Sequence, residues 1–323
     1  MTPATGPVPA SAPLGPLVRP PRLRPGAKVA VVAPSGPVPA DRLEAGLDIV
    51  RGWGLDPVVA PHVLDLHREL DYLAGSDEAR ARDLQDAWCD PTVSAVLCAR
   101  GGYGVQRMVD LLDWDAMRAA APKVFVGYSD ITALHEAFAA RAGVSTLHGP
   151  MVAALTFLKD PATQESLRAT LLEPEAVRTI GLDTAGALVP GRAHGVTLGG
   201  CVSLLAADLG TPLARPSAAG GLLLIEDVEE EPYRMDRILT QLLRSGWLDG
   251  VAGVALGSWA GCGPYEAVRT LMLDRLGGLG VPVAEELGFG HGPTNLTVPL
   301  GVPAVLDASA DTTTLTLDVP ALS

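Results

Sequence analysis

Short apolar runs alternate with amphipathic helical segments through the first half of the chain, and this alternation constrains the fold more than any other feature. Each run is short, apolar and often rich in Val, and most are bounded by Gly or Pro, as buried strands are. Strands that alternate with helices predict a parallel sheet covered on both faces. The strand candidates are KVAVVAPSG from residue 28, DPVVAP from 56, VSAVLCARGG from 93, KVFVGYSD from 123 and VSTLHGPM from 144.

The length of 323 residues predicts two domains with a cleft between them. Residues 1–26 are rich in Pro with little hydrophobic periodicity, so we expect a flexible tail outside the fold. Residues 27–157 would form an N-terminal domain, and the polar, helical residues 158–190 a linker. Residues 191–323 would form a more mixed C-terminal domain, with strand candidates GGLLLIEDV, VAGVALGSW and TTTLTLDV.

Composition excludes several classes of function. A formal net charge of −13 argues against binding to nucleic acid or to an anionic membrane surface, which requires clustered Lys and Arg. The four cysteines are widely separated, without the close pairs of a zinc or dithiol centre. We find neither a secretory signal nor an apolar run of membrane-spanning length, so we expect a cytoplasmic protein.

Candidate site residues follow the strands, because ligands of open parallel sheets bind at the carboxyl ends of the strands. Ser129 and Asp130 follow KVFVGY at the start of a helical segment. A polar pair there can cap the helix, or the serine can be a nucleophile on a sharp strand-to-helix turn. After another strand, Arg100 precedes Gly101 and Gly102, where backbone amides could approach a ligand or simply form a turn.

A nucleophilic serine needs a base and a carboxylate that orients the base. His291 lies in GFGHGPTNLTVPLG, a loop dense in Gly and Pro that could hold a side chain in place, and His148 follows a strand. Glu226 is the first charged residue after the run LLLI. The order Ser129, Glu226, His291 is that of the α/β-hydrolases, but Ile131 stands where their signature has a second Gly. Other histidines are open alternatives: His62, His67, His135 and His194.

Six motifs in one order resemble the LD-carboxypeptidases, also called muramoyltetrapeptide carboxypeptidases, and their microcin C self-immunity relatives. They extend from about Lys28 to Leu306. The motifs are VAPSGPV, ARGGYG, FVGYSDITALH, HGPM, LLIEDVEEEPYRMDRILTQL and GFGHGPTNLTVPLG. The resemblance implies an α/β protein, in which a flavodoxin-like N-terminal domain with a mainly parallel sheet carries the nucleophile and a β-rich C-terminal domain carries the other two residues.

The resemblance also implies a metal-free serine peptidase without a cofactor, with a triad across the domain interface and a homodimeric assembly. The triad would be Ser129, Glu226 and His291, and backbone amides of Asp130 and of the Gly101–Gly102 turn would form the oxyanion hole. Candidates for substrate contacts are Arg100, Tyr128, His148 and Arg234. Cys201 in LGGCVSLL stands where the family pattern has Asn, which puts a polar contact from that position in doubt.

The substrate that the resemblance implies is a peptidoglycan-derived tetrapeptide, cut between its diamino acid and the terminal D-Ala. A relative that cleaves a peptidyl-nucleotide or acyl-sulfamoyl antibiotic is the alternative, for which Trp259 and Tyr265 in SWAGCGPYEA could stack an adenine. An alternative of another class is a non-catalytic small-molecule binding protein on the same scaffold.

Overall fold

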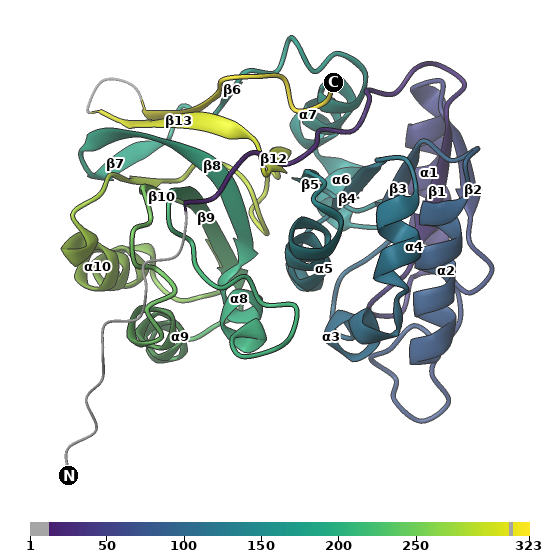
Figure 1. The fold of residues 1–323 in the computed structure, drawn as a ribbon, viewed down its shortest axis with the longest axis horizontal. Helices are drawn as coiled ribbons and strands as arrows, with labels where there is room; N and C mark the ends of the chain where they lie inside the picture. Colours follow the sequence, from purple (N-terminus) through teal and green to yellow (C-terminus); the bar gives the residue numbers. More distant parts are fainter. Residues whose placement is uncertain (1–12, 310–312) are drawn as a thin grey trace.

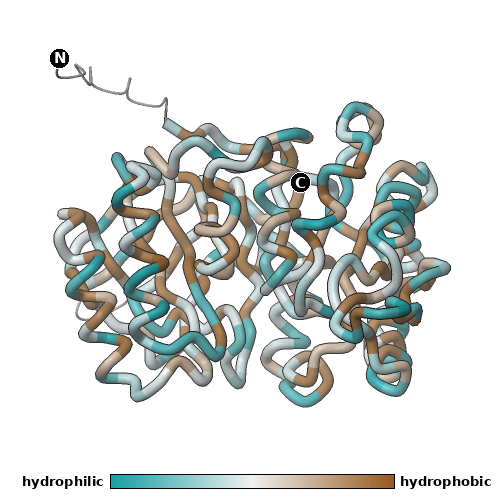
Figure 2. The backbone as a smooth tube through the Cα atoms, turned by 90° about the horizontal axis from the view of Figure 1, so that it is seen from below, coloured by the Kyte–Doolittle hydropathy of each residue, from teal (hydrophilic) through white to brown (hydrophobic). Residues whose placement is uncertain are grey.

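Two β-sheets, one in each half of the chain, organise the molecule (Figure 1). The computed structural model describes residues 13–309 and 313–323. Hydrophobic stretches, brown in Figure 2, are concentrated in the interior of both halves, and hydrophilic stretches lie mainly along the outer helices and loops. The predicted fold class, a flavodoxin-like part with a mainly parallel sheet and a β-rich part, is confirmed.

The N-terminal sheet has six strands among the described residues, in the order β12-β5-β4-β3-β1-β2. The order β2-β1-β3-β4-β5 is the flavodoxin-like one, and these five strands are parallel. The strand β12 comes from the C-terminal half of the sequence and pairs antiparallel with β5. The bounds are β1 (Lys28–Val32), β2 (Asp56–Val59), β3 (Ala95–Cys98), β4 (Val124–Gly127), β5 (Thr146–His148) and β12 (Val298–Leu300).

The helices of this half follow the predicted apolar spacing, with one interruption. The apolar segment from residue 105 to 120 forms two helices rather than one, because the Asp113 side chain accepts hydrogen bonds from the amides of Asp115 and Ala116 and starts a new helix. The helices are α1 (Ala40–Gly52), α2 (Asp77–Cys89), α3 (Val105–Met108), α4 (Trp114–Ala119), α5 (Thr132–Ala137), α6 (Leu155–Lys159) and α7 (Pro161–Leu172). Short 3₁₀ turns span Val109–Leu111 and Ser129–Ile131, and a π-helical turn spans Phe138–Ala142.

The C-terminal sheet has eight strands among the described residues, in the order β6-β14-β13-β8-β9-β10-β11-β7. Its centre, β8 to β11, is parallel, and its outer pairings are antiparallel. The strands are β6 (Thr179–Ile180), β7 (Gly186–Val189), β8 (Gly191–Cys201), β9 (Gly221–Val228), β10 (Gly253–Ala260), β11 (Val283–Glu285), β13 (Pro303–Ala308) and β14 (Thr313–Leu317). The helices are α8 (Val202–Asp208), α9 (Pro232–Arg244) and α10 (Tyr265–Leu276), and a 3₁₀ turn spans Gly277–Leu279.

The two halves are joined by buried contacts. One cluster of buried apolar side chains includes Val31 and Leu47 of the N-terminal half and Leu224 and Leu306 of the C-terminal half. Next to the sheets, the Arg215 guanidinium contacts the Glu136 carboxylate of α5 at 2.8 Å, with both side chains largely buried. The halves therefore share a core and a buried ion pair.

Two parts of the predicted organisation are wrong. Residues 13–26 were expected in a flexible tail, but they cross both halves (Figure 1): the Leu14 amide donates to Ala219, the Leu17 amide to Gly301 and the Val18 amide to Gly143. Their backbone groups find partners and Leu23 is buried, which stabilises the extended segment despite its Pro content. Residues 1–12 lie outside the described residues.

Residues 158–190 were expected to be a helical linker without a strand. They contain α7, but also β6 and β7, which are edge strands of the C-terminal sheet. Strands of two and four residues carry too few side chains to show an alternating pattern, so their pairing depends on the neighbouring strands. The C-terminal sheet therefore begins inside the segment predicted as a linker.

Candidate active site

Ser129 lies at the carboxyl end of β4, on the turn that leads into α5. Its backbone φ of 65° is in the left-handed region, which is rare for residues other than Gly. The side chain is half-buried, and the 3₁₀ turn that it begins leads directly into the helix. Left-handed backbone at such a turn costs free energy and is concentrated at functional sites. The geometry is that of a serine presented on a strained strand-to-helix turn.

The Asp130 side chain connects this turn to two neighbouring loops by hydrogen bonds. Its buried carboxyl group accepts hydrogen bonds from the Ser35 hydroxyl at 2.5 Å and from the Val105 amide at 3.0 Å. Burial raises the pKa of Asp130, although these two bonds act in the opposite direction. Ser35 follows β1 and Val105 follows the loop after β3, so one carboxyl group joins three strand-end loops. Among the hydrogen bonds of the described residues, the Asp130 carboxyl group makes none to the α5 amides, so the capping interpretation does not account for it.

Gly101 lies directly against Ser129. A Cβ atom on Gly101 would lie 3.0 Å from the Ser129 Cβ and 3.3 Å from its Oγ, so a side chain at this position would crowd the serine. Gly102 has a φ of 119°, which other residues rarely adopt. The two glycines therefore let the backbone of the loop after β3 approach the serine closely.

Glu226 and His291 form a pair in the C-terminal half. The His291 Nδ1 lies 2.6 Å from Glu226 Oε2, and the His291 amide donates to the same oxygen at 3.2 Å. Glu226 is completely buried near the end of β9, and His291 is supplied by the loop after β11. A Cβ on Gly290 would lie 2.5 Å from Glu226 Oε2, so only Gly lets this loop approach the carboxylate. The loop brings its histidine onto the carboxylate across 65 residues of sequence.

Electrostatics in this pair favour an ionised carboxylate. Burial alone would raise the pKa of Glu226, but the neighbouring His148 and His291 outweigh it and hold the pKa at about 2. Burial would lower the pKa of His291, but the hydrogen bond to Glu226 and the negative charges of Glu226, Asp227 and Glu229 together outweigh it and raise this pKa above 6.5. The charged carboxylate thus orients the imidazole and stabilises its protonated form.

The structure brings the serine turn and the histidine loop together through Tyr128. The ring of Tyr128, the residue before Ser129, lies 4.7 Å from the His291 ring, centroid to centroid. His148 is buried behind them, with Nε2 3.8 Å from the second carboxylate oxygen of Glu226. Neither ring nitrogen of His148 has a hydrogen-bond partner among the described residues. The Oε1 atom of Glu226 also lacks a hydrogen-bond partner among them. His148 therefore lies nearest the Glu226 oxygen that His291 does not contact.

Other predicted residues have different surroundings. The exposed Arg100 donates to the Pro37 carbonyl at 2.5 Å. The exposed Arg234, on the first turn of α9, lies 3.9 Å from Glu230, which precedes the helix. Cys201 is buried next to Glu226 in the sheet register, and its amide donates to the Thr132 hydroxyl of α5 at 2.9 Å. The structure thus brings together Ser129, Tyr128, His148, Glu226, His291, Gly101 and Asp130, and gives Arg100 and Arg234 surface partners.

Three of the four alternative histidines, His62, His67 and His135, have hydrogen-bond partners within the fold. His135 is buried, with Nε2 2.9 Å from the Gly127 carbonyl and Nδ1 2.8 Å from the Thr146 hydroxyl, and burial lowers its pKa to about 3.

The sequence analysis missed the contact between Ser35 and Asp130. Both residues follow strands of the parallel sheet, and the carboxyl ends of such strands lie at one edge, so this contact could have been predicted. Among the described residues, no group of three His, Cys, Asp or Glu side chains could hold a metal ion, and no helix is long and apolar enough to cross a membrane.

Comparison with protein families gives two matches in chain order. Residues 29–149 match the LD-carboxypeptidase N-terminal domain, and residues 194–306 match the LD-carboxypeptidase C-terminal domain. The first range contains Ser129, and the second contains Glu226 and His291.

Individual relatives agree with this match along almost the whole chain. A Streptomyces coelicolor protein provisionally named a carboxypeptidase is 73% identical over 95% of this chain and 98% of its own length. The murein tetrapeptide carboxypeptidase of Pseudomonas aeruginosa is 34% identical over 87% of this chain and 94% of its own length. The solved structure of a muramoyltetrapeptide carboxypeptidase from Oxalobacter formigenes superimposes with a TM-score of 0.77 and 28% identity, and covers 91% of this chain and 99% of its own.

Proposed function

This chain belongs to the LD-carboxypeptidase family, and we propose that it is a serine carboxypeptidase that releases the terminal D-Ala from peptidoglycan-derived tetrapeptides. The observation that carries the proposal is the 2.6 Å contact between Glu226 and His291 beside the strained turn of Ser129. Relatives named murein tetrapeptide or muramoyltetrapeptide carboxypeptidase support the substrate class. The cytoplasmic location and the homodimer remain predictions from the sequence.

The proposed reaction begins with proton transfer from Ser129 to His291. Because Nδ1 of His291 donates to Glu226, the other ring nitrogen, Nε2, is the one available to accept the serine proton. The Ser129 oxygen then attacks the scissile carbonyl, D-Ala leaves with the proton from His291, and water hydrolyses the acyl-enzyme. The Glu226 carboxylate stays ionised throughout and stabilises the imidazolium, consistent with its low pKa.

The oxyanion would be bound by backbone amides near Ser129. In this proposal the amides of Asp130 and of the Gly101–Gly102 turn donate to the oxygen of the tetrahedral intermediate. The close approach of Gly101 to the Ser129 side chain and the anchoring of Asp130 by Ser35 support this assignment. Arg100 and Arg234 remain candidates for the substrate's terminal carboxylate, and either would have to leave its present partner.

The test is release of D-Ala from L-Ala-γ-D-Glu-meso-diaminopimelyl-D-Ala, measured with and without a chelator. The intact protein should release D-Ala at the same rate in both conditions, and Ser129→Ala should abolish release while retaining its thermal unfolding transition. Ser245→Ala is the control, because Ser245 is an exposed serine at the end of α9. Release that survives Ser129→Ala would contradict the proposed nucleophile.

A peptidyl-nucleotide substrate is the second candidate. The microcin C7 self-immunity protein MccF of Escherichia coli is 27% identical over 73% of this chain. If the tetrapeptide is not cut by folded protein, the same assay with an aminoacyl sulfamoyl adenosine distinguishes this candidate from a protein that only binds ligands. A serine-directed fluorophosphonate should label Ser129 in either enzyme, but not in a non-catalytic binding protein.

A further inference from the structure

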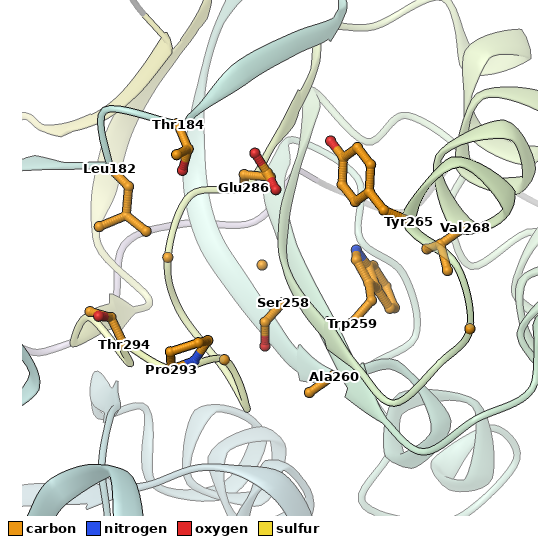
Figure 3. A pocket seen from close by; sticks show the side chains of 14 residues that line it. Leu182, Thr184, Ser258, Trp259, Ala260, Tyr265, Val268, Glu286, Pro293 and Thr294 are labelled. Atoms are coloured by element: carbon orange, nitrogen blue, oxygen red, sulfur yellow. The ribbon is translucent and has the colours of Figure 1, made fainter. Parts of the chain in front are cut away.

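A cavity of about 410 Å³ lies in the C-terminal half, beside the loop that carries His291. Its size is that of pockets that hold small molecules or side groups of larger ligands. Figure 3 shows Trp259 and Tyr265 on one side of it, and Leu182 and Thr184 on the other, with the Glu286 carboxylate between Thr184 and Tyr265. The triad proposed above does not use any of these side chains.

The cavity is lined by residues that are direct neighbours of the Glu226–His291 pair in sequence or in sheet register. Gly292, Pro293 and Thr294, the residues directly after His291, line it. On its other side, Trp259 is aligned in the sheet with Asp227, the residue after Glu226. The cavity therefore borders the loop that carries the proposed catalytic base.

Glu286 is the unusual residue of this cavity. It is half-buried with a φ of 57°, and no hydrogen bond or ion pair with another described residue reaches its carboxylate. The Arg269 guanidinium donates a hydrogen bond of 3.0 Å to the neighbouring Glu285, so it already has a carboxylate partner and does not pair with Glu286. Burial and the charge of Glu285 raise the pKa of Glu286. An unpaired carboxylate in a strained backbone conformation costs free energy, and a cation bound beside it would recover part of that cost.

The other lining residues fit a cation with N–H groups. The faces of Trp259 and Tyr265 carry negative π density, which attracts ammonium groups. The Ser258 hydroxyl oxygen is buried and lacks a hydrogen-bond partner among the described residues, so it can accept from an N–H donor. Among the described residues that line the cavity, none is Lys, Arg or His, so a phosphate or carboxylate would meet only negative charge.

We propose that this cavity binds an ammonium group, with Glu286 as its counter-ion and Trp259 and Tyr265 as its aromatic walls. In the reaction proposed above, the group is the side-chain ammonium of the diamino acid that precedes the cleaved bond. The identity of this ligand rests on the proposed function, whereas the charge and the aromatic walls of the cavity do not. Glu286 thereby determines substrate specificity without touching the reacting atoms.

The kinetic test compares two tetrapeptides that differ by one amine, L-Ala-γ-D-Glu-L-Lys-D-Ala and the same peptide with norleucine in place of Lys. The intact protein should cleave the Lys peptide with a kcat/KM about 10- to 100-fold higher, the range expected for a hydrogen bond to a charged partner. Glu286→Gln should reduce the ratio of the two kcat/KM values to near one. An undiminished Lys preference in Glu286→Gln would overturn the proposal.

The matched control is Glu266→Gln. Glu266 is exposed and adjacent to Tyr265 but does not line the cavity, so its substitution removes the same charge nearby and should leave the Lys preference intact. Loss of the preference in this variant too would assign the effect to the general negative field and overturn the specific role of Glu286.

Binding measured without turnover separates this inference from the proposed function. Calorimetry with Ser129→Ala should show tighter binding of the Lys peptide than of the norleucine peptide, and the added substitution Glu286→Gln should remove the difference. A Glu286-dependent difference without D-Ala release by the intact protein would support the ammonium site and contradict the proposed reaction. Equal binding of the two peptides, or no binding of the Lys peptide, would overturn the ammonium site whatever the activity.

Discussion

The serine turn and the Glu226–His291 pair are held in place in different ways. The turn is fixed within its own half: the Asp130 carboxyl group connects it to Ser35 and Val105, all at the carboxyl edge of one parallel sheet. The pair is assembled from two distant segments of the other half, and His148 of the N-terminal sheet lies against its carboxylate. The nucleophile thus depends on local strand order, and its proposed base depends on contacts between the halves.

The largest effect should come from removing the charge in the pair. Glu226→Gln keeps the shape of the side chain but removes the charge that orients His291, and it should lower kcat for D-Ala release by about 10⁴-fold, as in other serine triads. Labelling of Ser129 by a fluorophosphonate should slow as well, because this reaction also requires the base. If Glu226→Gln retains more than a tenth of the activity, the pair is not the catalytic base system.

The second prediction concerns the ion pair between Arg215 and Glu136, which connects α5, the helix after Ser129, to the C-terminal half. Arg215→Met leaves the Glu136 carboxylate buried without its partner, so the free energy of unfolding should fall by about 3 to 5 kcal/mol in urea titrations. Adding Glu136→Leu should restore much of the loss, because two apolar side chains then replace the ions.

The control for this prediction is the surface cluster in which the half-buried Arg168 contacts the exposed carboxylates of Glu165 and Glu173. Arg168→Met should cost less than about 1 kcal/mol, because solvent screens these contacts. If Arg215→Met lowers the free energy of unfolding by as little as Arg168→Met does, the interface between the halves tolerates an unpaired charge. The two parts of the site are then not rigidly coupled.

The contrast between the two parts of the site also explains what the sequence could predict. The flavodoxin-like half was predictable because each strand is a local apolar run, and Ser129 was found because ligand-binding residues follow such runs. β12 was missed because three residues carry no periodicity, and it pairs with β5 only through register across about 150 residues of sequence. Residues 13–26 were misjudged because their extended backbone is stabilised by partners in both halves rather than by their own pattern.

The candidate site shows the same limit. Glu226 and His291 were chosen partly from their positions and partly from the family resemblance, but the pattern did not reveal that His148 lies at the other carboxylate oxygen. The cavity beside Glu286 is formed by four segments that no local motif connects. Contacts within one sheet edge follow from strand order, whereas contacts between loops of different halves follow only from the packed structure.

The smallest predicted effect is a pH dependence that separates activity from stability. His291 accepts a proton only when neutral, and its folded pKa is raised above 6.5, so kcat/KM should rise with pH through a midpoint above 6.5. A raised folded pKa contributes stability that is complete below 6.5 and is lost as the pH rises through the folded value. The pKa of Glu226, lowered from 4.5 to about 2, contributes stability that is complete above 4.5 and is lost as the pH falls towards 2. The stability difference between the intact protein and Glu226→Gln, measured by urea unfolding, should therefore be largest between pH 4.5 and 6.5, where activity is still incomplete. A stability difference that does not vary with pH would show that the charges of the pair contribute nothing to folding.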